Sequence, residues 1–312
     1  MVREELRDGF KFVPMFNPFY IKDAIKVAVN FRSLEEYKDY ILEHNIEKAE
    51  IVMPDLKILQ LCPQLKYLRI HPSYNAPEKF DFSPLYEMPE VRALNCINVH
   101  GMSAEHISDV DYSRINGLVS LSVGVNKGTL NFNKVETLKS LKAGGFKGKQ
   151  RDLTDLFCSR DLDTLTLIEC GMYSLNGIET SQKMQCLYLH YNRTLNDISA
   201  LRKVKGTLKA LRIENCPKIT DFSVLEELEN LELLELSGSN TLPNLDFLNN
   251  LKNLKLFCFS MNVLDGNLTP CINVPYVYSP KNRKHYNLKD CELPKGKCKM
   301  GNEDIEQWRR LE

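Results

Sequence analysis

The 312-residue chain has no excess of charge of either sign, because 41 Lys and Arg residues balance 41 Asp and Glu residues. It therefore offers no overall field that would attract nucleic acid or an acidic membrane surface. It also lacks an apolar run long enough to span a bilayer. The first residues carry acids and no apolar stretch, unlike a signal peptide. From these absences we expect a cytoplasmic protein that binds neither nucleic acid nor membrane.

Cysteine is present at ten positions, but no two cysteines form a C-x-x-C pair. A disulfide framework is typical of short, secreted chains with closely spaced cysteines. Scattered cysteines in a long chain without an export signal favour reduced, buried thiols. His285, Cys291 and Cys298 are not spaced like zinc ligands and have no obvious fourth ligand. We therefore expect neither a metal site nor a cofactor.

Catalytic motifs are missing as well. The glycine-rich segment 144–149 lacks the G-x-x-x-x-G-K-[ST] order of a phosphate-binding loop. The short basic run 281–285 is typical of a solvated surface. No Cys–His or Ser–His–Asp arrangement can be assembled from the spacing of the residues. We therefore predict no catalytic residue and a chain that is not an enzyme.

What the sequence does contain is a repeat. Five segments with an L-x-x-L-x-L pattern begin at Leu162, Met184, Leu208, Leu231 and Leu254. Successive starts are 22, 24, 23 and 23 residues apart, and such a spacing is typical of a solenoid of leucine-rich repeats. Looser copies begin at Ile46, Leu65, Val91, Leu118 and Leu141. We expect about nine or ten repeats over residues 46–276.

The repeat pattern predicts which side chains are buried. Successive side chains on a strand point to opposite faces, so the two aliphatics of each L-x-L point inward and their neighbours line a concave wall. Three residues later, a buried Asn, Cys or Ser is expected to bond the backbone of the turn. The residues at this turn position are Cys170, Asn192, Cys216, Ser239 and Asn262.

Each turn is followed by apolar residues three apart, as at Phe222, Leu225 and Leu228. This spacing favours short 3-10 or helical returns on the convex side. The predicted fold class is therefore an α/β solenoid, a right-handed leucine-rich repeat superhelix shaped as a horseshoe or arc. A parallel β-sheet is expected on its concave face.

The two ends leave the repeat pattern, and we interpret them as caps. The N-terminal region, residues 1–45, contains a predicted capping helix that begins at Ser33, with Glu36 completing a capping box. Residues 277–312 are predicted to form a C-terminal cap with a terminal helix. That helix contains Trp308, the only tryptophan, which we expect to pack against the last coil.

The repeat length, the Asn or Cys turn and the short return resemble the bacterial leucine-rich repeat family that includes the internalins. The resemblance covers residues 46–276 and is sharpest from Leu162 to Asn262. It implies a solenoid whose concave face binds another protein. Because a signal peptide and a wall-sorting tail are missing, the chain is more similar to intracellular members, some of which are suspected immunity or anti-toxin factors.

The strand pattern also assigns the residues that a partner would contact. Tyr and Arg are enriched in binding hot spots, and two groups of such residues fall on neighbouring strands. The candidate partner-binding residues are Tyr67, Arg69, His71 and Asn95 in a first group, and Tyr188, His190, Arg212, Glu214 and Glu235 in a second. The second group has an alternative interpretation as a cross-strand charge ladder that keeps the face soluble.

These observations favour a non-catalytic module that binds a protein partner on the concave face, as an immunity, anti-toxin or scaffold protein. A second hypothesis makes the solenoid the recognition subunit of an enzyme complex. A third is binding of a small ligand or glycan, which predicts a cluster of exposed aromatics, whereas the wall offers Tyr67 and Tyr188. No motif specifies an oligomeric state.

Overall fold

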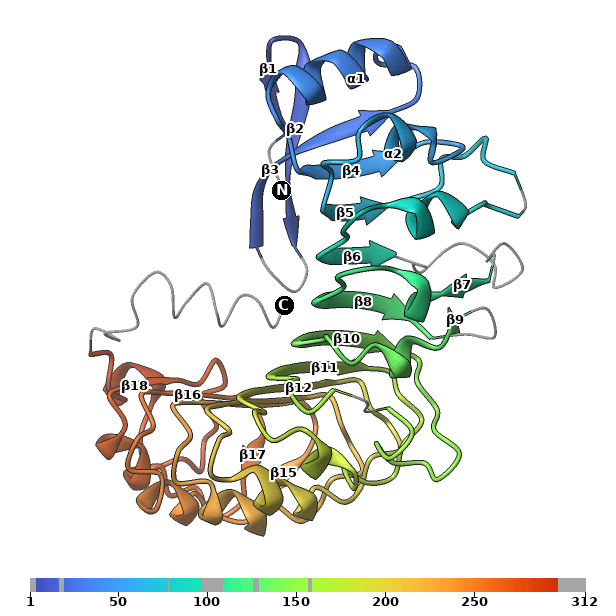
Figure 1. The fold of residues 1–312 in the computed structure, drawn as a ribbon. Coiled ribbons are helices and arrows are strands. Elements are labelled where there is room, and N and C mark those ends of the chain that lie inside the picture. Colours follow the sequence, from blue (N-terminus) through green and yellow to red (C-terminus); the bar gives the residue numbers. More distant parts are fainter. Residues whose placement is uncertain are drawn as a thin grey trace. The chain divides into compact units, whose positions relative to one another are not determined.

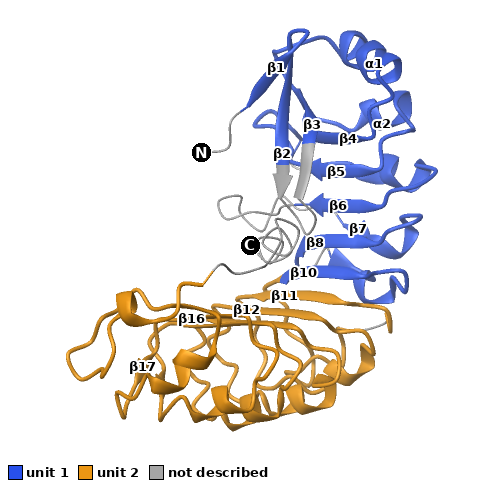
Figure 2. Cartoon of the chain, turned by 90° about the vertical axis from the view of Figure 1, so that its left-hand side faces the viewer, with its two compact units in different colours: residues 1–143, 312 blue, residues 144–311 orange. Residues whose placement is uncertain are grey.

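The computed structural model describes residues 4–16, 20–77, 79–96, 109–125, 129–156 and 159–296, with side chains omitted for 15–22. The chain divides into two compact units, residues 1–143 and residues 144–311 (Figure 2). The strands of both units belong mostly to parallel ladders (Figure 1). The predicted terminal helix with Trp308 and the thiols of Cys158 and Cys298 lie outside the described residues.

The first unit begins with antiparallel strands. β1 (Glu5–Arg7) pairs with β2 (Phe10–Phe16), and β2 pairs with β3 (Tyr20–Ala28). The β1–β2 turn is formed by Asp8 and Gly9, whose φ angles of 50° and 79° are both positive, as a type I′ turn requires. β3 then pairs in parallel with β4 (Lys48–Val52). The repeat pattern did not predict β1–β3, because they carry no repeat motif.

Helix α1 (Leu34–Glu43) begins at Ser33, where the sequence shows a capping box. The Ser33 hydroxyl accepts a hydrogen bond from the Glu36 backbone N–H (3.2 Å), and the Glu36 carboxylate accepts one from the Ser33 N–H (2.8 Å). The bond from the Ser33 N–H lowers the pKa of the Glu36 carboxyl. Tyr37 and Ile41 lie on the helix face that is fully buried, so the helix is fixed by packing as well as by its cap.

Parallel strands continue through the rest of the first unit, in the order β4, β5 (Tyr67–Ile70), β6 (Ala93–Cys96), β8 (Ser120–Gly124) and β10 (Ser140–Gly144). The connections contain α2 (Lys57–Leu61), η1 (Ser83–Glu87), η3 (Tyr112–Arg114) and η4 (Phe132–Lys134). A small sheet pairs β7 (Val110–Asp111) with β9 (Thr129–Leu130). The strand register aligns Ala49, Leu68, Leu94 and Leu121, all of them buried, in one interior column.

The second unit has a more regular repeat. Its strands are β11 (Thr164–Ile168), β12 (Cys186–His190), β13 (Ala210–Glu214), β14 (Leu233–Ser237), β16 (Leu256–Phe259) and β18 (Tyr276–Tyr278). Its returns are η5 (Ile178–Thr180), η6 (Ser199–Val204), η7 (Ser223–Glu227), η8 (Asp246–Asn249), η9 (Thr269–Asn273) and η10 (Asp290–Glu292). β15 (Thr241–Leu242) pairs with β17 (Asn262–Val263). The short 3-10 returns agree with the apolar spacing of three.

The interior column of the second unit confirms the predicted register. Leu165 aligns with Leu187, Leu187 with Leu211, and Leu211 with Leu234. Each of these four side chains is at most 1% exposed. The predicted leucine-rich repeat solenoid is therefore confirmed, because each coil buries its aliphatics against those of the next.

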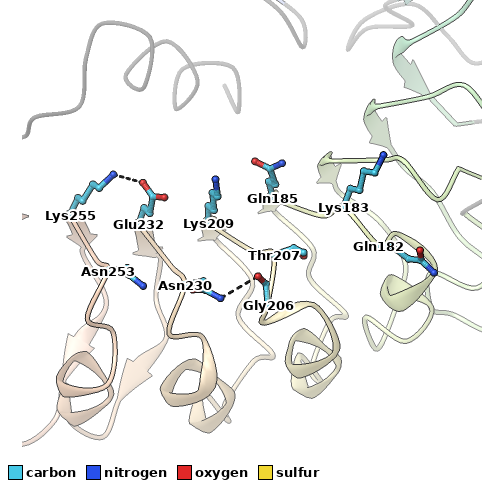
Figure 3. Close-up of a pocket in the computed structure, with 10 residues that line it drawn as sticks. All are labelled: Gln182, Lys183, Gln185, Gly206, Thr207, Lys209, Asn230, Glu232, Asn253 and Lys255. Atoms are coloured by element: carbon cyan, nitrogen blue, oxygen red, sulfur yellow. Dashed lines mark hydrogen bonds and ion pairs between the residues drawn. The ribbon is translucent and has the colours of Figure 1, made fainter.

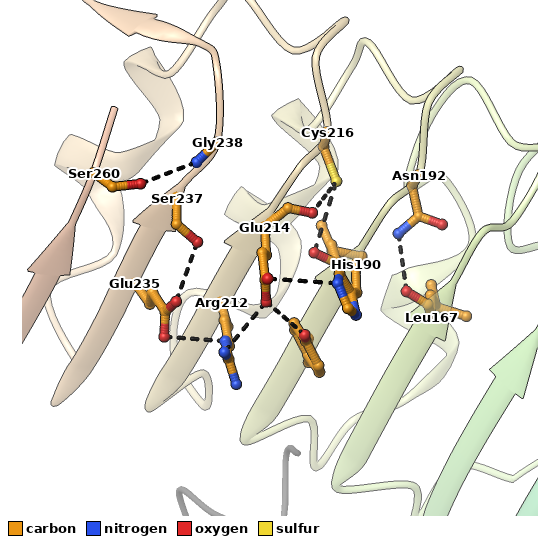
Figure 4. Close-up of polar contacts among 12 residues, drawn as sticks. Leu167, His190, Asn192, Arg212, Glu214, Cys216, Glu235, Ser237, Gly238 and Ser260 are labelled. Carbon is orange, nitrogen blue, oxygen red and sulfur yellow. Dashed lines mark hydrogen bonds and ion pairs between the residues drawn. The ribbon is translucent and has the colours of Figure 1, made fainter. Parts of the chain in front are cut away.

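Asn192 shows how the turn position joins neighbouring repeats. Its side chain is fully buried and accepts a hydrogen bond from the Cys170 backbone N–H (2.8 Å). It also donates one to the Leu167 carbonyl (2.9 Å) (Figure 4). Cys170 and Cys216 occupy the same position and are buried as well. The prediction for these three turn residues is confirmed.

The prediction for Ser239 was wrong. Ser239 is exposed, and the following residue, Asn240, is buried instead. Asn240 donates to the carbonyls of Cys216 (3.0 Å) and Ile219 (2.7 Å). Gly238 has a φ of 134°, a conformation that favours glycine. One more residue lies between the last strand aliphatic and the buried amide than in the repeats of Asn192 and Cys216, so the buried amide moves by one position.

The prediction for Asn262 was wrong as well. Asn262 is half-buried in β17, whereas the preceding residue, Met261, is fully buried. The Asn262 N–H donates to the Asn240 carbonyl (3.2 Å). Asn262 thus belongs to the small β15–β17 ladder and does not fill the interior. The last turns therefore depart from the ideal repeat although their strands keep the register.

Candidate functional site

The strand residues that alternate with the buried aliphatics lie on the opposite face of the sheet. In the second unit we call this surface the strand face. The strand register arranges its residues in three rows. The apolar row consists of Cys186, Ala210, Leu233, Leu256 and Tyr276. The charged row consists of Tyr188, Arg212, Glu235, Cys258 and Tyr278, and the third row of His190, Glu214 and Ser237.

The apolar row is continuous over five neighbouring strands. Its first four members are 4–9% exposed, and Cys258 and Tyr276 pack against them. Neighbouring strands lie about 4.8 Å apart, so the row extends over about 19 Å. This length suits a segment of a partner better than a single small group.

Arg212 is the centre of the charged row. Its Nη2 lies 3.2 Å from Glu214 Oε2, and its Nε lies 3.0 Å from Glu235 Oε2 (Figure 4). Its guanidinium also lies over the Tyr188 ring, 4.6 Å from the centroid. The Tyr188 hydroxyl donates to Glu214 Oε2 (2.7 Å). One guanidinium thus joins two carboxylates and one aromatic ring on three strands.

Two further side chains complete this network. His190 Nε2 lies 3.5 Å from Glu214 Oε1, and its ring stacks on Tyr188 with 5.3 Å between the centroids. The Ser237 hydroxyl donates to Glu235 Oε1 (3.1 Å). The structure therefore brings together all five residues of the second predicted group. The cross-strand charge pair of the alternative interpretation is also present, between Arg212 and Glu235.

Burial controls the electrostatics of the network. Burial raises the pKa of Glu235, and the opposing effects of Arg212 and Ser237 do not cancel this rise. Burial and the bond to Glu214 raise the pKa of Tyr188 far above its ordinary value, so this hydroxyl stays a donor. With two carboxylates and one guanidinium, the network has an excess of negative charge when His190 is neutral.

The first predicted group lies on the equivalent face of the first unit. Arg69 aligns with Glu50 on one side and with Asn95 on the other. Its Nη1 lies 3.2 Å from Glu50 Oε2, and Tyr67 packs against Val13 and Ala24. Glu50 was not among the predicted residues, although its position between Ala49 and Ile51 places it on this face.

Burial affects both Asn95 and His71 of the first group. Asn95 is buried, and its Oδ1 has no hydrogen-bond partner among the residues that the structure describes. Burial, together with the positive charges of Arg69 and Lys26, lowers the pKa of His71 to about 4. His71 is therefore neutral at pH 7.

Tyr276 and Tyr278 extend the strand face and were not predicted. The segment from Val274 to Ser279 keeps the first two apolar positions of the repeat, but Ser279 replaces the third. Lys295 lies over both rings, 5.7 Å from the Tyr276 centroid and 5.6 Å from that of Tyr278. The incomplete motif is the signal that could have extended the array to β18.

A polar groove of about 520 Å³ runs beside the starts of the strands (Figure 3). Its lining includes Lys183, which pairs with Asp161 (2.7 Å), and Lys255, which pairs with Glu232. The groove thus contains mostly amides and paired charges. Such a lining is typical of a solvated surface.

Buried thiols account for several cysteines of the second unit. Burial raises the pKa of Cys170 to about 12, that of Cys216 to about 11 and that of Cys271 to about 12. These thiols are protonated at neutral pH and are poor nucleophiles.

His285, considered above for zinc, contacts the Val263 carbonyl through Nε2 (3.0 Å). Within the described ranges, no group of three or more His, Cys, Asp or Glu residues is arranged to hold a metal ion.

The helices that the structure describes are also too short or too polar to cross a bilayer.

No family model matches the chain. Among solved structures, an internalin (inlF) from Listeria monocytogenes is 20% identical, with a TM-score of 0.54 over 77% of this chain and 69% of that chain. A leucine-rich repeat protein of Leptospira interrogans is 16% identical, with a TM-score of 0.48 over 94% and 70% of the two chains. At 20% identity, the first comparison shows that this chain shares the leucine-rich repeat fold of the Listeria internalin.

Proposed function

We propose that this chain is a non-catalytic module that binds a protein partner on its strand face. The observation that carries the proposal is the apolar row beside the charged network of Tyr188, Arg212 and Glu235. Protein interfaces combine an apolar centre with a polar rim, and Tyr and Arg are common among their strongest contacts. The network is fixed before binding, so little side-chain entropy is lost when a partner docks.

The size of the strand face limits how a partner would use it. Six strands about 4.8 Å apart and about five residues long form a patch of roughly 24 Å by 16 Å. This area of roughly 400 Å² is about half of what one partner buries in a standard interface. The partner would therefore also contact the loops that flank the strands.

The first group extends the proposal to the other unit. Arg69, with Tyr67, His71 and Asn95, forms a second candidate contact surface, in which Glu50 is the acidic neighbour. Such contact surfaces would serve a protein that neutralises a toxin or a scaffold that holds a complex together. Each of the two surfaces is proposed as an independent contact surface, and each can be tested separately.

The test is to place a bulky side chain on the strand face and to follow partner capture. Ser237→Arg adds a guanidinium to the third row, next to carboxylates that can accept it. Glu226→Arg is the matched control, because it adds the same side chain to an exposed position of the return η7. Tagged wild-type chain and both variants would be used to capture proteins from the native host.

We expect the wild type and Glu226→Arg to retain the same partner, and Ser237→Arg to lose it. Circular dichroism spectra would establish that all three proteins are folded. Loss of the partner with Glu226→Arg and retention with Ser237→Arg would move the binding surface to the returns and reject this proposal.

A further inference from the structure

Among the residues that the structure describes, the carboxylates of the charged network have acceptor capacity that is left unused. Glu214 Oε1 has His190 at 3.5 Å, and Glu235 Oε1 accepts one bond, from the Ser237 hydroxyl. An ionised carboxylate has about four lone-pair sites over its two oxygens. Arg212, the guanidinium between the two carboxylates, is already shared by both. A second donor with positive charge would therefore find acceptors at the two Oε1 atoms.

The electrostatics also favour a further cation. The pKa of Glu235 is raised by burial and also by the neighbouring charge of Glu214, although Arg212 lies in contact. A buried carboxylate whose pKa stays raised is incompletely compensated. At the nearby edge of the sheet, Lys255 is paired with Glu232, and Lys209 is exposed. The positive charge of a solvated lysine is screened by water and salt, so Lys209 does little to compensate the negative charge of the half-buried carboxylates.

The apolar row lies beside the carboxylates, so the cation that fits them should be carried on a hydrocarbon stem. Leu233 and Glu235 lie two residues apart on β14 and face the same side, at a separation of about 7 Å. Leu256 aligns with Leu233 on the next strand. A lysine or arginine side chain has a hydrocarbon stem that packs on apolar surface and a charged end that reaches polar groups. An acidic group would be repelled here, and a purely apolar group would desolvate both carboxylates further without adding a donor to those that Arg212, Tyr188 and Ser237 supply.

We propose that the partner inserts a basic side chain into the strand face. Its ammonium or guanidinium binds the carboxylates of Glu214 and Glu235, and its stem packs on Leu233 and Leu256. This inference rests on the proposed function and adds the chemistry of the partner: a protein segment with a lysine or arginine among apolar neighbours.

The probe for this site is n-butylguanidinium, which reproduces the end of an arginine side chain. The full chain would be labelled at its leucine methyl groups and titrated by NMR, with the Leu233 and Leu256 signals assigned by substitution. n-Butanol and n-butyrate serve as ligands with the same stem but neutral or negative ends. We expect saturable shifts at Leu233 and Leu256 with n-butylguanidinium and none with the other two compounds.

The protein variants test the role of the carboxylates. Glu214→Gln with Glu235→Gln keeps the size of both side chains and removes their charge, and we expect it to weaken binding of the probe by at least about tenfold. Glu226→Gln removes an exposed carboxylate from η7 and should leave binding unchanged. Unchanged methyl signals elsewhere would show that the variants are folded. Equal binding of n-butanol, or unchanged binding to the double variant, would overturn the inference.

The outcome separates this inference from the proposed function. If n-butylguanidinium produces no saturable shift but Ser237→Arg still abolishes partner capture, the strand face binds its partner without a basic anchor. If the probe binds as expected but Ser237→Arg captures the partner normally, the basic site exists and the proposed interface is rejected.

Discussion

Replacing the buried turn amide Asn192 by alanine tests how the repeats are joined. The substitution removes the acceptor of the Cys170 N–H and the donor to the Leu167 carbonyl, at 2.8 and 2.9 Å. Both backbone groups would remain buried, and an unsatisfied buried group costs about 1–3 kcal/mol. We therefore expect Asn192→Ala to lower the free energy of unfolding by about 2–6 kcal/mol.

Urea unfolding followed by far-UV circular dichroism measures this loss as a lower midpoint concentration. Ser239→Ala is the matched control, because Ser239 has the same place in the repeat pattern but is exposed. It should change stability by less than about 0.5 kcal/mol. Equal midpoints for Asn192→Ala and Ser239→Ala would refute the reasoning, because the turn amide would then contribute nothing to the joining of the repeats.

Three further predictions concern other parts of the chain. Asn240→Ala should destabilise the protein in urea clearly more than Ser239→Ala, because Asn240 bonds the carbonyls of Cys216 and Ile219; the reverse order would contradict the shifted turn. The folded-state pKa of His71, about 4, lies below the ordinary histidine value of 6.5, so the unfolded chain binds more protons between these values and stability should fall as pH drops from 6.5 to 4. His71→Gln should flatten this pH dependence in thermal melts, and an unchanged slope would exclude His71 as its cause. In thiol labelling of the native protein followed by mass spectrometry, exposed Cys291 should react well before buried Cys170, and labelling of Cys170 first would contradict its burial.

The interior of the solenoid could be predicted because a strand has a period of two and the repeat a nearly constant length. Leu165, Leu187, Leu211 and Leu234 recur at this spacing, and the structure aligns them as the pattern requires. The shift at Ser239 could not be predicted in this way. It depends on one additional residue between the last strand aliphatic, Leu236, and the buried Asn240, and the spacing of the aliphatics does not encode that addition. The Asp8–Gly9 turn was a usable signal for the first hairpin, although it lies outside any repeat.

The sequence predicted on which face of the sheet the candidate residues lie, but not which of their side chains are in contact. Alternation along β12 and β13 placed Tyr188 and Arg212 on one surface. The sequence placed Glu214 and Glu235 in the same group as Arg212, and the structure shows that Arg212 contacts both. That outcome depends on side-chain conformation and on the burial of Tyr188, which a pattern of residue types does not contain. Tyr278 was missed because its strand lacks the last aliphatic of the motif.

The most direct test of the account is methyl NMR of the chain in complex with the partner that it captures. Binding on the strand face predicts shifted signals for Ala210, Leu233 and Leu256, which lie in the apolar row. The methyl groups of Ala200 and Val224, which lie on the returns, should stay unchanged. Shifts confined to the returns, with the apolar row unaffected, would contradict the central claim that this chain binds its partner through the strand face.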